Sequence, residues 1–162
     1  MKGIITACAA DIVCIMASFI CPPFILFLLC FEGVQTVSDE LTSRVYSFMS
    51  WAAGITAFVI YALNGTFRWD FFVLLIISIL LFVIISLVGA FADGDVECTV
   101  PYLIAMAALN SNPLEKALIV LIVSSGTMTL EYILRKLITK KVPENLPFMK
   151  NLFLGMVVAS VF

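Results

Sequence analysis

Long apolar runs, separated by short polar segments, make up most of the chain. Six of these runs are predicted to be helices: 4–31, 45–63, 71–91, 99–109, 117–134 and 148–162. A helix needs about 20 mainly apolar residues to cross the hydrocarbon core of a bilayer. The run 71–91 has no charged residue and is the clearest transmembrane span. The pattern therefore predicts an all-α integral membrane protein, a single polytopic domain with about six transmembrane helices.

Prolines and short lengths modify this picture. The pair Pro22-Pro23 interrupts the first run, which we interpret as one kinked helix, because proline removes a backbone hydrogen bond and clashes with the preceding turn. The runs 99–109 and 148–162 are shorter than a full span, so they are expected to be shallow or to borrow flanking residues. The segments 32–44 and 92–98 are polar and are predicted to be loops.

The composition excludes most classes of soluble protein. Residues of the set AVILMFWYC make up 63% of the 162 residues, and charged residues make up only 12%. A soluble domain of this size could not hide so much apolar surface from water. The formal net charge of −2 offers no basic excess for phosphate, so no nucleic-acid partner is expected. Membrane lipid is the expected surrounding.

The chain has no histidine and five cysteines, none of them in a CxxC pair. The absence of histidine excludes Ser-His-Asp and Cys-His catalysis and imidazole metal sites. The unpaired cysteines indicate neither a metal site nor a redox dithiol, and we interpret them as buried thiols. Neither a metal nor a cofactor is predicted.

The distribution of basic residues predicts the orientation in the membrane. With six spans, one side carries six basic residues and the other three, and the more basic side is normally cytoplasmic. The six are Arg44, Arg135, Lys136, Lys140, Lys141 and Lys150, and the three are Lys2, Arg68 and Lys116. We therefore expect the segments 32–44, 92–98 and 135–150 to face the cytoplasm and the N-terminus to lie outside.

Asp39 and Asp95 are the candidate catalytic residues. Two predicted spans separate them, and an even number returns both carboxylates to the same membrane face. Two close carboxylates cannot both ionise cheaply, so the ionised one can activate water while the protonated one polarises a scissile carbonyl. Gly94, directly before Asp95, would let a substrate backbone approach closely. On spacing alone, two solvated loop acids remain the alternative interpretation.

These residues resemble the type IV prepilin and archaeal preflagellin peptidases, which are GxGD membrane aspartyl proteases. Asp39 followed by residues 42–45 (TSRV) is similar to the first-aspartate motif of that family, and residues 92–95 (ADGD) are similar to its GxGD motif. The segment 146–149 (LPFM), followed by 153–155 (FLG), is similar to the stretch before the last helix of the family. The resemblance runs from Asp39 to the C-terminus.

The chain departs from the family pattern at three points. Ala92 stands where the first glycine is usual, Glu97 where bacterial members often have lysine, and Tyr46-Ser47 where a proline–asparagine pair often closes the first motif. The chain also lacks the length and the CxxC pairs of the larger bacterial enzymes that add N-methylation. The resemblance therefore implies peptidase activity only, the cleavage of a short basic leader from pilin-like or archaellin precursors on the cytoplasmic side.

Three further acids, Glu40, Asp93 and Glu97, lie close to the two aspartates in the sequence. We interpret them as candidate substrate-binding residues for the basic leader. The alternative for Asp93 and Glu97 is a structural role, because the dipole of a helix favours acids at its N-terminus.

A different class of function would use Asp11 and Glu131, which lie inside apolar runs. Carboxylates within a membrane are costly and often functional, so a small ion- or proton-coupled transporter is the alternative hypothesis. A structural subunit of a membrane complex is the third. The sequence leaves open which precursor is cut, which aspartate acts as the base, and the oligomeric state.

Overall fold

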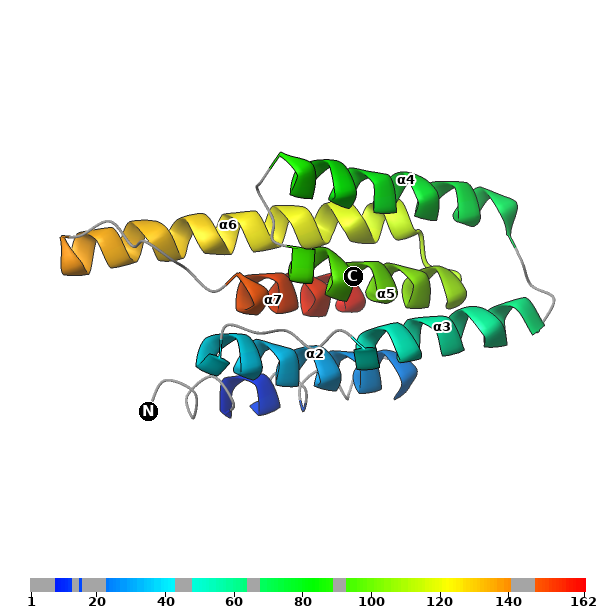
Figure 1. Ribbon diagram of the computed structural model, residues 1–162, viewed down its shortest axis with the longest axis horizontal. Helices are drawn as coiled ribbons and strands as arrows, with labels where there is room; N and C mark the ends of the chain where they lie inside the picture. Colours follow the sequence, from blue (N-terminus) through cyan, green and yellow to red (C-terminus); the bar gives the residue numbers. More distant parts are fainter. Residues whose placement is uncertain are drawn as a thin grey trace.

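Every regular element in the part of the chain that the structure describes is a helix, which confirms the predicted all-α fold class. The computed structural model describes residues 8–12, 15, 23–42, 48–63, 68–88, 93–140 and 148–162. After the helical residues 8–12, the described helices are α2 (Pro23–Thr42), α3 (Phe48–Leu63), α4 (Trp69–Leu87), α5 (Asp93–Ala108), α6 (Pro113–Thr139) and α7 (Met149–Val161) (Figure 1).

In the described parts of the polar segments 32–44 and 92–98, which are residues 32–42 and 93–98, the structure has helix where the sequence predicted loops. α2 continues as a helix to Thr42, and α5 already begins at Asp93. The reason in α2 is that its polar residues recur every three to four positions, which is the spacing of one helix face. These residues are Glu32, Gln35, Thr36 and Asp39. Their polarity marks a face of the helix and not its end.

The kink predicted at Pro22-Pro23 lies partly outside the described residues. α2 begins at Pro23, where proline suits the first turn of a helix because its missing N–H would have no partner there in any case.

α6 has clear signals at both ends. The Asn112 Oδ1 accepts a hydrogen bond from the backbone N–H of Leu114 at 3.1 Å, and Pro113 occupies the first helical position. At the other end, Lys140 has a φ of 54°, and its N–H donates to the carbonyl of Lys136. The 27 residues between these ends extend over about 40 Å, more than the thickness of a hydrocarbon core.

Two of the described helices, α4 and α6, are long and apolar enough to cross a membrane. Only 17% of the most apolar stretch of each is buried inside the protein, which is unlike the core helix of a soluble fold. On α4 the outward face is a stripe of large apolar side chains: Val73, Ile76, Ile77, Leu80 and Ile84. Six spans are not shown, because α3 and α7 are apolar but shorter and α2 and α5 do not meet the same criteria.

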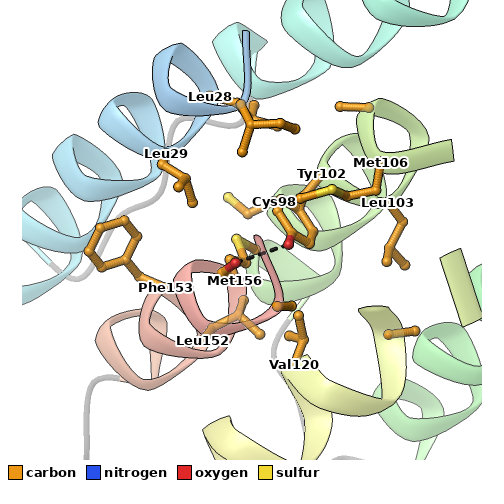
Figure 2. Close-up of a cluster of buried hydrophobic side chains, with 14 of the residues drawn as sticks. Leu28, Leu29, Cys98, Tyr102, Leu103, Met106, Val120, Leu152, Phe153 and Met156 are labelled. Atoms are coloured by element: carbon orange, nitrogen blue, oxygen red, sulfur yellow. Dashed lines mark hydrogen bonds between the residues drawn. The ribbon is translucent and has the colours of Figure 1, made fainter. Parts of the chain in front are cut away.

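α5 is the central helix of the bundle and contacts each of the other five labelled helices (Figure 1). Its side chains between Cys98 and Ala107 are almost all buried. Figure 2 shows Tyr102 of α5 turned towards Met156 of α7, with Leu29 of α2 in the same cluster. The Tyr102 hydroxyl donates to the backbone carbonyl of Met156 at 2.9 Å, so this contact ties α5 to α7.

Two glycines allow neighbouring helices to approach closely. A Cβ on Gly54 of α3 would lie 2.9 Å from the Cα of Pro101 in α5, and a Cβ on Gly155 of α7 would lie 2.8 Å from the carbonyl oxygen of Val120 in α6. A side chain at either position would therefore force two helices apart. Small residues at helix crossings are typical of membrane proteins, where close backbone packing stabilises helix association.

Candidate functional site

α2 turns a polar stripe towards the interior of the bundle. Glu32 is 0% exposed, Gln35 is 4% and Thr36 is 2% exposed, and Asp39, in the last turn, is half-buried. The opposite face of the helix is more exposed and largely apolar. Burying a polar group costs free energy unless it has hydrogen-bond partners, so such groups are kept for a structural or functional reason. The interior face of α2 is therefore the first part of the candidate site.

The first turns of α5 supply the second part of the site. Asp95 is 6% exposed, and Cys98 and Thr99 on the same helix face are fully buried. The Thr99 Oγ1 donates to the backbone carbonyl of Asp95 at 2.7 Å, so this hydroxyl is satisfied within its own helix. Asp95 thus stands in the first turn of a rigid, central helix, where the helix dipole favours an acid.

Asp39 and Asp95 lie at the same end of the bundle. α2 and α5 contact each other and run in opposite directions (Figure 1). Asp39 is in the last turn of α2 and Asp95 in the first turn of α5, so the two helix ends that carry them lie on the same side of the bundle, the side from which α6 projects (Figure 1). Both residues belong to the inward-facing side of their helices.

The other predicted site residues are arranged differently. Gly94 is half-buried next to Asp95, whereas Glu97 is exposed on another face of α5 and lines a cavity of about 260 Å³ that also borders Leu87 of α4. The backbones of Glu40 and Asp93 are helical, and their side chains lie outside what the structure describes. Glu97 is therefore not directed to the same face as Asp95.

Glu32 is the most deeply buried acid among the described residues. Within this part of the chain neither of its carboxyl oxygens has a hydrogen-bond partner, and the buried hydroxyl of Ser50 in α3 has none either. Glu32 lies outside the two candidate spans, and burial raises the pKa of its carboxyl to about 7. The nearby Ser50 hydroxyl and Cys98 thiol offset part of this rise. The Glu32 carboxyl therefore holds its proton up to about neutral pH.

The thiol of Cys98 is close to both buried acids. Its pKa is raised first by burial and then by Glu32 and Asp95. Figure 2 shows this side chain among the apolar residues of the core. Since the thiolate and not the thiol is the nucleophile, Cys98 offers no covalent chemistry at neutral pH. What it provides is a polarisable neighbour common to Glu32 and Asp95.

Glu131 of α6 is tied to three polar side chains. Its Oε1 accepts from the Nζ of Lys150 at 2.5 Å and lies 2.6 Å from the Nη2 of Arg135. The Asn151 Nδ2 donates to its Oε2 at 3.4 Å. These contacts join the C-terminal half of α6 to the first turn of α7, which is a structural explanation for an acid in an apolar run.

Asp11 lies on the other side of α2 from the polar stripe. It lines an open pocket of about 760 Å³ with residues of the more exposed face of α2, among them Val34 and Leu41. Glu131 contacts α7 instead. The described contacts therefore do not join the two acids of the transporter hypothesis.

Groups of three or more cysteine, aspartate or glutamate side chains that could hold a metal ion do not occur among the residues that the structure describes.

Comparisons with known proteins return no match: no protein-family model, no curated protein and no solved structure is significantly similar to this chain. The resemblance to the prepilin and preflagellin peptidases therefore depends on the motif residues of the sequence itself.

Glu32 and Ser50 were not among the predicted site residues. Glu32 was predicted to be part of a loop and Ser50 part of an apolar span. The signal for Glu32 was present in the three- and four-residue spacing of polar positions that ends at Asp39, which is typical of a helix face. No comparable signal identifies Ser50, a single hydroxyl in an apolar run.

Proposed function

We propose that the protein is a membrane aspartyl endopeptidase in which Asp39 and Asp95 form the catalytic dyad. The observation that carries the proposal is the location of both residues on inward-facing helix surfaces, at the end of the bundle where α2 finishes and α5 begins. The motif residues 92–95 support it independently. Two carboxyl groups can hydrolyse a peptide bond without histidine, metal or cofactor.

The chemistry requires that the two carboxyl groups share one proton. The ionised group accepts a proton from water, whose oxygen attacks the scissile carbonyl carbon, and the protonated group gives its proton to the carbonyl oxygen. In the second step the first group passes its proton to the amide nitrogen as the C–N bond breaks. The second group recovers a proton from the hydroxyl of the intermediate, so the dyad returns to its starting state.

The proposed substrate is the leader segment of a type IV pilin-like or archaellin precursor. Such leaders are basic, and the acids Glu40 and Asp93, next to the dyad in sequence, would attract lysine and arginine. Glu97, on another face of α5, would add to the negative charge of this region. The apolar helix that follows the leader in these precursors would remain in lipid, beside the exposed apolar faces of the enzyme.

We propose a multi-pass location in the cell membrane, with α4 and α6 crossing it and the dyad facing the cytoplasm. The support is the length and apolar outer surface of these two helices, together with the excess of basic residues in the segments expected on that side. The transporter hypothesis has less support, because Glu131 is occupied by Lys150 and Arg135.

The substitutions Asp39→Asn and Asp95→Asn test the proposal, with Asp70→Asn as the matched control. Asp70 is an exposed acid in the first turn of α4, paired with Arg68. Membranes that contain each variant are incubated with a pilin-like and with an archaellin-like precursor, and the cleaved product is quantified. Each dyad variant is expected to cleave at least about 100-fold more slowly than wild type, and the control to cleave at the wild-type rate.

A wild-type protein that cleaves neither precursor contradicts the proposal, and so does undiminished cleavage by both dyad variants. Precursors whose leader lysines are replaced by glutamine extend the test to the substrate. They are expected to be cut more slowly by wild type if acids near the dyad bind the leader.

A further inference from the structure

We propose that Glu32 is a positioning residue of the aspartyl site, a buried neutral carboxyl group at the meeting point of α2, α3 and α5 that allows Asp95 to take part in a singly charged dyad. This inference rests on the proposed function and adds a third acid to it.

Glu32 lies in an interior that is closed to solvent. Its side chain is 0% exposed, and within the described residues both carboxyl oxygens lack a hydrogen-bond partner. The Ser50 hydroxyl, also 0% exposed, is in the same condition. Two such groups on adjacent helices indicate a polar point inside an otherwise apolar core. An ion at that point would be unpaired and strongly disfavoured, so the carboxyl is held neutral.

Cys98 connects Glu32 to Asp95. Cys98 is three residues after Asp95, one turn along the same face of α5, and its thiol responds to both acids. If Glu32 ionised, a second negative charge would stand in a weakly screened interior near Asp95. Asp95 would then retain its proton more strongly. Neutral Glu32 therefore keeps the dyad in the state with one proton and one charge.

Few titratable groups from the helices packed around Glu32 lie near its carboxyl group. α5 contributes Cys98, which also has Asp95 as a neighbour, and α3 contributes the uncharged Ser50. On α2 itself Asp39 is seven residues away, or about 10 Å along the axis. From α7, which also packs on α2, Lys150 is engaged by Glu131. Among the described groups, Cys98 is thus the titratable neighbour of Glu32, and Asp95 lies one turn before Cys98 on the same face of α5.

The experiment compares wild type with Glu32→Gln and Glu32→Ala, each in lipid membranes. Glutamine has the shape of the neutral acid and cannot ionise, whereas alanine removes the polar group. The first measurement is precursor cleavage from pH 5 to pH 8.5. Wild type is expected to lose about tenfold in rate between pH 6 and pH 8, as a single group ionises. Glu32→Ala is expected to be slow throughout, and Glu32→Gln to recover the rate at pH 6 and to lack the fall above it.

The second measurement does not depend on cleavage. Infrared spectroscopy of the purified protein in lipid detects the carbonyl stretch of a protonated, buried carboxyl group. Wild type is expected to show a band from Glu32 at pH 6 and to lose that band as the pH passes about 7. The Glu32 band, identified as the difference between wild type and Glu32→Gln, is expected to be absent from the variant at every pH. Asp95→Asn identifies the contribution of Asp95 in the same spectra. The protonated fraction of Asp95 is expected to rise in wild type as Glu32 ionises. In Glu32→Gln, where residue 32 cannot ionise, no such rise is expected.

The outcomes separate the two proposals. If wild type cleaves no precursor but the infrared bands behave as expected, the proposed function fails and the coupling of Glu32 to Asp95 stands. If the wild-type bands are unchanged by Glu32→Gln, the positioning role is wrong whatever the cleavage assay shows. If Glu32→Gln abolishes cleavage at every pH as completely as Asp95→Asn, Glu32 is a member of the dyad and the positioning role is also wrong.

Discussion

The Nζ of Lys150 donates to the Oε1 of Glu131 at 2.5 Å and joins the first turn of α7 to the C-terminal half of α6. Arg135, one turn further along α6, lies 2.6 Å from the same oxygen. One carboxylate therefore neutralises two cations where α6 and α7 pack together. This arrangement accounts for an acid within an apolar run without an ion pathway.

Replacing Glu131 by glutamine is expected to lower the free energy of unfolding by about 1 kcal/mol, because two partly buried cations lose their common partner. The free energy is measured by reversible unfolding in mixed micelles. Asp70→Asn, which breaks the exposed pair with Arg68, is the control and is expected to leave the free energy of unfolding almost unchanged, because solvent screens an exposed ion pair. Equal losses in the two variants would contradict the structural role of Glu131.

Gly155→Ala is expected to destabilise the protein by about 1–3 kcal/mol, because its Cβ would meet the backbone of Val120 at 2.8 Å. Gly126→Ala is the matched control: it is also a glycine-to-alanine change in a described helix, but its Cβ would have no atom within 4 Å. Alanine is the better helix former, so the control is expected to be neutral or stabilising by up to about 1 kcal/mol. The same unfolding assay compares the two, and a Gly155→Ala variant as stable as Gly126→Ala would show that the close α6–α7 contact is wrong.

Glu32 is expected to make stability fall as the pH rises. The pKa of its carboxyl is about 7 in the folded protein against an ordinary 4.5, so between these values the folded state holds a proton that the unfolded chain has released. The free energy of unfolding therefore decreases across this window, by on the order of 3 kcal/mol, and this contribution is constant above it. Unfolding of wild type and of Glu32→Gln is measured from pH 4.5 to pH 8, because the difference removes the effect of the other acids. Parallel curves would rule out a raised pKa at Glu32.

The helices were predictable from the sequence where one physical signal dominates. The uncharged run 71–91 corresponds to α4. The last residues of α6, 135–139, were missed because the basic residues that begin at Arg135 were assigned to the cytoplasmic segment 135–150. α6 continues to Thr139 because long basic side chains fit the last turn of a helix, where the helix dipole stabilises their positive charge. Charge alone therefore does not end a helix.

The candidate site was predictable only in part. Asp39 and Asp95 follow from motif spacing, but the burial of Glu32 depends on Ser50 and Cys98, which are 18 and 66 residues further along the chain. A buried acid and a loop acid look alike in a sequence, because what distinguishes them is the set of tertiary neighbours. The helical spacing of Glu32 and Asp39 was the one local signal, and it indicates a shared face without saying what covers it.

The central claim, that Asp39 and Asp95 act as one catalytic unit, is tested most directly by the rate of precursor cleavage in the two single asparagine variants and in the double variant. Residues that act as a unit give losses that do not add. The account predicts that each single variant loses nearly all activity and that the double variant is no slower than the slower single one. Wild-type cleavage by either single variant, or losses that multiply in the double variant, would contradict it.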